Sequence, residues 1–156
     1  MINKILVPLD GSELAECTLV YLESLIKDTS EGEVTLLNVV KVDIPWATMR
    51  ATRQPIDMES VRKPLFAASK KYLTKTASKL RSKGMKVKTK AIESDRPADA
   101  IIDYAQEKKM DLILITTHGH TGFSRKLNLL LGKVAFDVTH KSPVPVLLIR
   151  PEMCRL

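Results

Sequence analysis

Five short segments of the chain have the hydrophobic pattern of β-strands. Four of them are apolar almost throughout, as in strands buried on both faces of a parallel sheet. These four are Lys4 to Leu9, Glu33 to Val40, Asp111 to Thr116 and Val144 to Ile149. The fifth, Lys86 to Ile92, alternates lysine with smaller residues. One wet face and lysine-rich flanks are typical of a strand at the edge of a sheet.

Between these segments, apolar residues recur at helical spacing. Ser12 is positioned to cap a first helix, in which Leu14, Cys17, Tyr21 and Leu25 fall on one face. Further helices are predicted from about Met58 to Ser82, from Pro97 onward and from Gly132 to Lys141.

The alternation of strands and helices predicts an α/β fold with an open parallel sheet and helices on both faces. A length of 156 residues suits one domain, which we expect to span residues 1–156. The last strand, Val144 to Ile149, is apolar, and only the short segment RPEMCRL follows it. Because a bare apolar edge promotes aggregation, we predict a homodimer that buries this strand against a second copy.

Composition and charge narrow the choice of partners. No apolar run approaches the ~20 residues that span a bilayer, and the N-terminus lacks a signal-peptide layout, so a cytoplasmic protein without membrane contact is expected. The net charge of +7 is spread over amphipathic helices, and only seven aromatic residues are present to stack on bases. We therefore interpret the charge as solvated surface and expect no nucleic-acid partner. Cys17 and Cys154 lack metal-site spacing and are predicted to be free thiols.

Ligands of open parallel α/β sheets bind beyond the carboxyl ends of the strands, where strand order reverses. That rule selects Pro8 to Ser12, Asn38 to Val40, Thr116 to Gly119 and Gly132-Lys133. Asp10 could bind a ribose hydroxyl or a base edge, or it could simply close the turn with Gly11. Val39 could offer backbone groups to a purine ring, as almost any strand end can.

The segment THGHTGFSRKLNLLLGKV, residues 117–134, contains the most informative glycines. Gly119 and Gly122 permit close backbone approach, and Gly132 precedes a helix whose free N–H groups could receive phosphate. Lys133 lies in the first helical turn, where a cation opposes the helix dipole unless an anion is bound. The glycines match neither the P-loop nor the Rossmann motif.

Catalytic groups are not evident in the sequence. His118 lies on the rim without a Ser, Cys or Asp partner at a suitable spacing, and His120 and His140 are expected at the surface. No paired carboxylates or nucleophile elbow are found. We therefore predict no catalytic residues, no metal site and no dedicated enzyme.

Five segments, in order, resemble the universal stress protein (UspA) family over essentially the whole chain: KILVPLDGSELAE, VTLLNVV, PADAIIDYA, MDLILITTHGHTG and LLLGKVAFDVTHKSPVPVLLIR. The resemblance implies an adenine-nucleotide alpha-hydrolase-like fold, with a five-stranded parallel sheet in the order 3-2-1-4-5 that dimerises through its fifth strand. It also implies binding of ATP or AMP, with or without Mg²⁺, and no general catalytic activity. Pro8, Asp10, Gly11 and Ser12 match the family's first strand.

The phosphate loop departs from the family pattern G-x-x-G, nine residues, then G-[ST]. A literal match uses Gly122 as its second glycine, but the family's GxHG ends the fourth strand, and His118-Gly119 then puts its first glycine at Thr116. In this register the loop to Gly132 is three residues longer than the pattern. Lys133 also replaces the hydroxyl residue, which exchanges a short hydrogen-bonding group for a flexible cation.

We interpret the chain as a dimeric, nucleotide-binding universal stress protein that acts in the stress response. The residues expected at the nucleotide are Pro8, Leu9, Asp10, Val39, Thr116, His118, Gly119, Gly132, Lys133 and Val134. The resemblance implies that Asp10 and Val39 bind the adenosine and that the loop from Gly119 to Lys133 binds the phosphates. One alternative is a UspA-like protein-interaction module without nucleotide, in which the irregular loop from Asp43 to Met58, with Trp46, contacts a partner. Another is slow ATP hydrolysis, for which no water-positioning group is identified.

Overall fold

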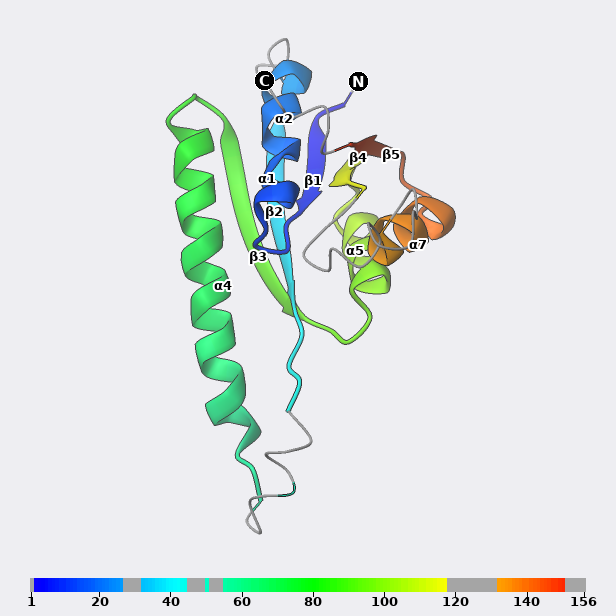
Figure 1. Ribbon diagram of the computed structural model, residues 1–156. Helices are drawn as coiled ribbons and strands as arrows, with labels where there is room; N and C mark the ends of the chain where they lie inside the picture. Colours follow the sequence, from blue (N-terminus) through cyan, green and yellow to red (C-terminus); the bar gives the residue numbers. More distant parts are fainter. Residues whose placement is uncertain (1, 27–31, 45–49, 51–54, 118–131, 151–156) are drawn as a thin grey trace.

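The computed structural model describes residues 2–26, 32–44, 50, 55–117 and 132–150. Along this part of the chain the elements are β1 (Lys4–Pro8), α1 (Glu13–Glu16), α2 (Thr18–Ile26), β2 (Glu33–Val40), α4 (Met58–Arg81), β3 (Lys86–Glu93), α5 (Pro97–Glu107), β4 (Leu112–Thr116), α7 (Lys133–Lys141) and β5 (Val146–Ile149). The five strands pair in parallel in the order β3-β2-β1-β4-β5 (Figure 1). The predicted fold class, strand order included, is therefore confirmed.

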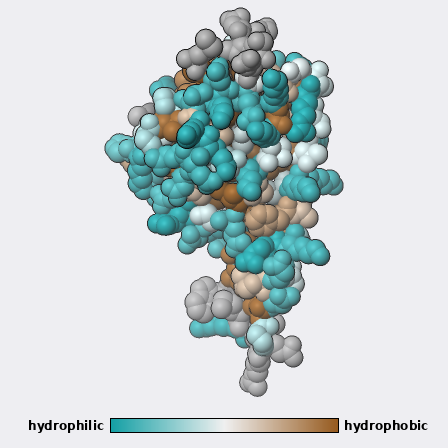
Figure 2. All heavy atoms as spheres, turned by 180° about the vertical axis from the view of Figure 1, so that it is seen from behind, coloured by the Kyte–Doolittle hydropathy of each residue, from teal (hydrophilic) through white to brown (hydrophobic). Residues whose placement is uncertain are grey.

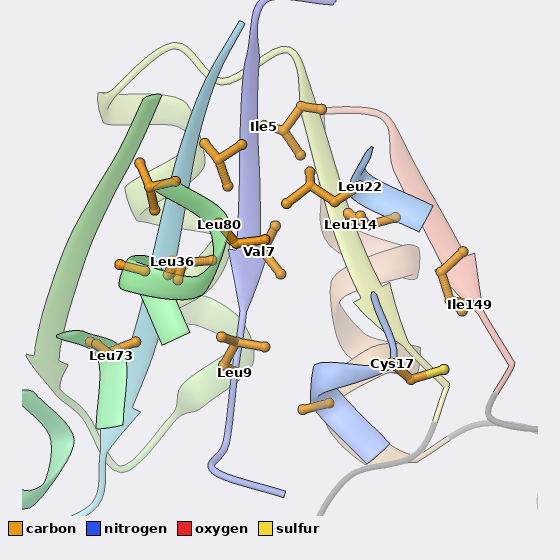
Figure 3. Close-up of a cluster of buried hydrophobic side chains, with 14 of the residues drawn as sticks. Ile5, Val7, Leu9, Cys17, Leu22, Leu36, Leu73, Leu80, Leu114 and Ile149 are labelled. Atoms are coloured by element: carbon orange, nitrogen blue, oxygen red, sulfur yellow. The ribbon is translucent and has the colours of Figure 1, made fainter. Parts of the chain in front are cut away.

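Helices cover both faces of the sheet. Successive residues of a strand point to opposite sides, and because the central strands are apolar on both sides, each face needs a covering layer. On one face, Ile5 and Val7 of β1 pack in a core with buried residues of α1, α2 and α4, among them Leu22 and Leu73 (Figure 3). On the other face, Leu6 packs with residues of α5 and α7, such as Ile101. The two cores hold the strands so that their carboxyl ends meet at one rim of the sheet.

Strand order reverses at β1, which lies between β2 and β4. The β1–β2 ladder runs in register from Lys4 opposite Glu33 to Pro8 opposite Leu37. The β1–β4 ladder is shorter and includes Leu6 opposite Ile113. Chain segments that leave the sheet on either side of β1 therefore diverge, which is the usual origin of a ligand-binding crevice in this architecture.

Two predicted boundaries differ from the observed ones, each because of local hydrogen bonds. The first helix is interrupted at Cys17, whose N–H bonds to the Leu14 carbonyl at 3.3 Å in a tighter turn that separates α1 from α2. The last strand begins at Val146 rather than Val144. The hydroxyl of Ser142 bonds to both the N–H and the carbonyl of Val144, at 3.1 and 2.8 Å, and holds that residue in a turn.

The cysteine prediction is wrong for Cys17. Its side chain is buried, as expected, but it is disulfide-bonded. Cys154, the other cysteine of the sequence, lies outside the described residues.

The charge pattern of the surface agrees with the prediction of an edge strand. β3 ends the sheet, and its lysines Lys86, Lys88 and Lys90 are exposed. Hydrophilic residues cover most of the face in Figure 2, and the hydrophobic ones form small, separate patches. None of the described helices is long and apolar enough to cross a membrane.

Candidate functional site

A pocket of about 390 Å³ opens at the carboxyl ends of β1, β2 and β4, beside the place where strand order reverses. Its size falls in the range of small-molecule and cofactor sites. The described residues that line it are Pro8, Leu9, Asp10, Ala15, Leu37, Val39, Lys41, Pro97, Ile101, Ile115, Thr116, Thr117, Gly132, Lys133, Val134 and Ala135. Most of this lining is apolar, and the charged groups are Asp10 and two lysines.

The pocket brings together most of the residues selected from the sequence. Eight of them lie around it: Pro8, Leu9, Asp10, Val39, Thr116, Gly132, Lys133 and Val134. His118 and Gly119 lie outside the described residues. The pocket thus unites four separate stretches of sequence at one site, and the role of each residue toward a ligand stays a prediction.

Asp10 lies in the turn that joins β1 to α1. Its Oδ1 accepts hydrogen bonds from the N–H and the hydroxyl of Ser12, at 2.9 and 2.6 Å. The same hydroxyl accepts from the Ala15 N–H at 3.1 Å and so caps α1. Gly11 between them has a φ of +86°, which residues with a side chain rarely adopt. Asp10 therefore closes the turn, as one of the two hypotheses states, and the turn also holds its carboxylate at the pocket.

The backbone of Val39 faces the side of β2 from which β1 has departed. Odd-numbered residues of β2 bond toward β1, because the Glu33 N–H donates to the Asn3 carbonyl and the Leu37 carbonyl accepts from the Leu9 N–H, at 2.7 and 2.8 Å. Val39 continues this alternation by one step, but the β1 strand ends at Pro8. Its N–H and carbonyl consequently point toward the pocket that Val39 lines.

The first turn of α7 forms another wall of the pocket. The Gly132 N–H donates to the carbonyl of Thr117 at 2.6 Å, which ties the start of this helix to the end of β4. No side chain of the described residues caps α7. Backbone N–H groups in the first turn of a helix lack partners within the helix and attract anions. This wall is therefore suited to a phosphate or carboxylate group.

Lys133 in this first turn has an ion-pair partner within the same helix. Its Nζ lies 2.8 Å from Oδ2 of Asp137, one turn further along, and the side chain remains largely exposed. The hydrogen bond between the two raises the pKa of Lys133 and lowers the pKa of Asp137. The Asp137 carboxylate therefore offsets part of the unfavourable interaction between the Lys133 cation and the positive end of the helix dipole.

Sequence reasoning missed the wall formed by Pro97 and Ile101 of α5 and the lysine that follows β2. That lysine, Lys41, pairs with Asp43 at 2.9 Å, and the pKa of Lys41 is raised mainly by this hydrogen bond. The strand-end rule, applied to the turn after Lys86–Glu93, could have identified the α5 residues. A lysine two positions beyond Val39 carries no such signal.

The described residues contain no grouping of three or more His, Cys, Asp or Glu side chains that could hold a metal ion. His140 stacks on Phe136 along α7, with 4.7 Å between ring centroids, and this position is separate from the pocket lining. Asp10 is the one carboxylate among the described lining residues. Among the described residues, the lining offers backbone groups and cations that can bind and orient a ligand, and it contains one carboxylate and no histidine.

Comparison with known proteins gives consistent matches. The chain matches the model of the Universal stress protein family over residues 1–150. It is 30% identical over 148 residues to universal stress protein MJ0531 of Methanocaldococcus jannaschii, covering 95% of this chain and 82% of that protein. The solved structure of the hypothetical protein MJ0577 from the same organism superposes with a TM-score of 0.79 at 28% identity, covering 96% of both chains. A universal stress protein from Arabidopsis thaliana, solved with AMP bound, shares the fold at a TM-score of 0.65 and 19% identity, covering 95% of this chain and 91% of that one.

Proposed function

Since the chain belongs to the universal stress protein family, we propose that it is a binding module for adenine nucleotides, ATP or AMP, and not a dedicated enzyme. The observation that carries this proposal is that one pocket gathers the first-strand turn, the end of β2 and the first turn of α7. The AMP-bound relative has the same fold and so supports the ligand class, although its low identity transfers no residue roles.

The nucleoside end of the ligand is assigned to the β1–β2 side of the pocket. Val39 directs a backbone N–H and a carbonyl into the pocket, and these can pair with adjacent acceptor and donor groups on the edge of a purine. Asp10 is held by Ser12 at the same rim, where its carboxylate can accept hydrogen bonds from ribose hydroxyls. Apolar side chains such as Ile115 and Ile101 would cover the faces of the ring.

The phosphate end is assigned to the first turn of α7. N–H groups without partners inside the helix and the helix dipole attract anions there, and the exposed Lys133 adds a cation. Mg²⁺ that enters with ATP would be held mainly by the phosphates, since Asp10 is the one carboxylate in the described lining. Any difference in affinity that arises from the different charges of ATP and AMP would therefore depend mainly on Lys133 and on the first turn of α7.

We further propose that two chains associate through β5. This strand ends the sheet, pairs with β4 on one side, and presents Leu147 with 37% of its surface exposed. An apolar edge of this kind is typically covered in the native assembly. Trp46, which supported the alternative of a protein-interaction module, lies outside the described residues.

The function is tested by asking whether the protein carries nucleotide. The purified protein is denatured, and the released small molecules are identified by mass spectrometry, before and after incubation with excess ATP and gel filtration. We expect an adenine nucleotide at up to one molecule per chain. Absence of nucleotide from both samples would contradict the proposal and favour the interaction module.

A further inference from the structure

The most distinctive polar contact beside the pocket joins α4 to the end of β1 through one amide side chain. The hydroxyl of Ser69 on α4 donates to Oδ1 of Asn38 at 2.6 Å. The Nδ2 of Asn38 donates in turn to the carbonyl of Leu9 at 2.7 Å. Ser69 is buried, with 7% of its surface exposed, and Asn38 is half-buried, so this bond is partly shielded from competing water.

The Leu9 carbonyl is the acceptor that the parallel ladder would use next. In the alternation described above, the bond after Leu9 N–H to Leu37 would run from the Val39 N–H to the Leu9 carbonyl. That bond is absent, as is the following one from the Gly11 N–H to the Val39 carbonyl. The side chain of Asn38 donates to this acceptor instead, and the ladder ends at Leu37, two residues before Val39.

We propose that Asn38 and Ser69 are positioning residues that keep the backbone of Val39 open for the edge of the bound base. This inference rests on the proposed adenine-nucleotide site. Asn38 satisfies the Leu9 carbonyl, which removes the competing partner of the Val39 N–H and fixes the path of the chain into Asp10. The Leu9 carbonyl can only accept, so it turns Nδ2 toward itself, and the Ser69 hydroxyl donates to Oδ1 and holds the amide in that orientation from α4.

The positioning role of Asn38 and Ser69 predicts a selective loss of contacts to the base, whereas a purely structural role would affect the stability of the whole domain. Loss of the Ser69 hydroxyl removes the bond that orients the amide, and loss of the Asn38 amide frees the Leu9 carbonyl to compete for Val39. Either change should weaken contacts to the base edge and leave the phosphate contacts at Lys133 intact. Binding of adenosine and ATP should therefore fall by the same factor.

The test compares variants of the full chain by calorimetric titration with adenosine and with purine riboside, which lacks the 6-amino group. Ser69→Ala and Asn38→Leu should each weaken adenosine binding by about tenfold and bring its affinity close to that of purine riboside. Ser69→Thr keeps the hydroxyl and should bind like the wild type. Thr76→Val is the matched control, since it removes another buried hydroxyl of α4. That hydroxyl donates to the Tyr72 carbonyl at 3.0 Å, and neither residue lines the pocket.

Three outcomes would overturn parts of this account in separable ways. If the wild type binds adenosine and Ser69→Ala and Asn38→Leu keep both its affinity and its preference over purine riboside, the positioning role is wrong while the nucleotide site stands. If Thr76→Val loses as much affinity as Ser69→Ala, the effect is one of general stability and the positioning role is again wrong. If the wild type binds neither adenosine nor ATP, the proposed function itself fails.

Discussion

Lys133 and Asp137 form an ion pair across one turn of α7, with 2.8 Å between Nζ and Oδ2. The pair links the loop departure seen in the sequence to the pocket, because Lys133 lines the pocket and replaces the hydroxyl residue of the family pattern. In the absence of a phosphate, the carboxylate offsets the unfavourable position of the cation at the helix N-terminus. A bound phosphate would have to compete with Asp137 for the same ammonium group.

Replacement of Lys133 by alanine should therefore affect phosphate binding selectively. We expect Lys133→Ala to weaken ATP binding by about three- to tenfold and to leave adenosine binding nearly unchanged. Calorimetric titration with both ligands measures the difference. Equal losses for ATP and adenosine would show that Lys133 does not contact the phosphates.

The partner of this lysine supplies the control with the opposite sign. Asp137→Asn releases Lys133 from its ion pair and removes a negative charge near the phosphates, so ATP binding should strengthen by about two- to fivefold. The variant should lose little stability, because an exposed helical ion pair at this spacing contributes little. Weaker ATP binding in Asp137→Asn would contradict competition for the lysine.

Asp10 serves both the turn and the proposed ribose contact, and one substitution separates the two roles. Asp10→Asn keeps an oxygen that can accept from Ser12 and removes the charge, so the melting temperature should change little. Adenosine and ATP should both bind about tenfold more weakly, since hydrogen bonds to a charged acceptor are the stronger ones. Unchanged binding of both ligands would show that Asp10 stabilises the turn and does not contact the ribose.

Ser12 provides the matching change on the structural side. Ser12→Ala removes the cap of α1 and should cost about 1 kcal/mol in the free energy of unfolding. It should alter nucleotide binding less than Asp10→Asn does. Urea unfolding of both variants compares their stability, and calorimetric titration with adenosine compares their binding; a larger loss of binding in Ser12→Ala than in Asp10→Asn would contradict this division of roles.

The proposed dimer is tested at Leu147 of β5. Leu147→Lys places a charge on the exposed apolar edge, so the sedimenting species should shift from about twice the chain mass of 17.4 kDa to that mass. Leu65→Lys is the control: Leu65 is 38% exposed, close to the 37% of Leu147, and lies on α4, which packs against β3 at the other edge of the sheet. A dimer that survives Leu147→Lys, or that Leu65→Lys disrupts equally, would place the interface elsewhere.

Asp111 makes the stability of the sheet depend on pH. Its Oδ2 accepts hydrogen bonds from the N–H groups of Asn3 and Lys4, at 2.9 and 2.8 Å. These two bonds, of which the bond from Asn3 has the larger effect, lower the pKa of Asp111 below its ordinary value of 3.8. The stabilisation is thus fully present above pH 3.8 and is lost as the pH falls through the lower folded value.

Asp111→Asn should accordingly lower the free energy of unfolding at pH 7 by about 0.5–1 kcal/mol, a value reduced for the exposure of the carboxylate. The difference from the wild type should shrink as the pH falls from 3.8 through that lower folded value. Asp103→Asn, an exposed change on α5 at a residue for which the described part of the chain shows no hydrogen bond or ion pair, should show no such trend. A difference that stays constant with pH would argue against titration of Asp111.

The sequence predicted the strands well because their hydrophobic patterns leave few alternatives for the backbone, whereas the strand order came from the resemblance to the universal stress protein family. The sequence also predicted that the ends of β1 and β2 and the start of α7 lie together, because parallel strands place their carboxyl ends at one rim, while the roles of these residues toward a ligand stay predictions. The break at Cys17 and the late start of β5 were not predictable, since single hydrogen bonds of Cys17 and Ser142 decide them. Such bonds compete with helix and strand by margins smaller than hydrophobic patterning reveals.

The pocket was predicted less completely than the fold. Ile101 was expected only on the apolar face of its helix, and nothing in its spacing indicates that it also borders a ligand site. The role of Asn38 depends on a partner 31 positions away, Ser69, and on where the β1 ladder ends. These features depend on how α4 and α5 pack across the sheet, and the hydrophobic pattern along the sequence does not predict that packing.

The central claim is that an adenine nucleotide binds at the carboxyl ends of β1 and β2 with its phosphates at α7. Its most direct test is a titration of ¹⁵N-labelled protein, stripped of nucleotide, with adenosine and then with ATP, followed by amide chemical shifts. We predict shifts at Asp10 and Val39 with both ligands, and at Gly132 and Lys133 with ATP. Absence of shifts at millimolar ATP, or shifts confined to the lysines of α4 and β3, would contradict the account.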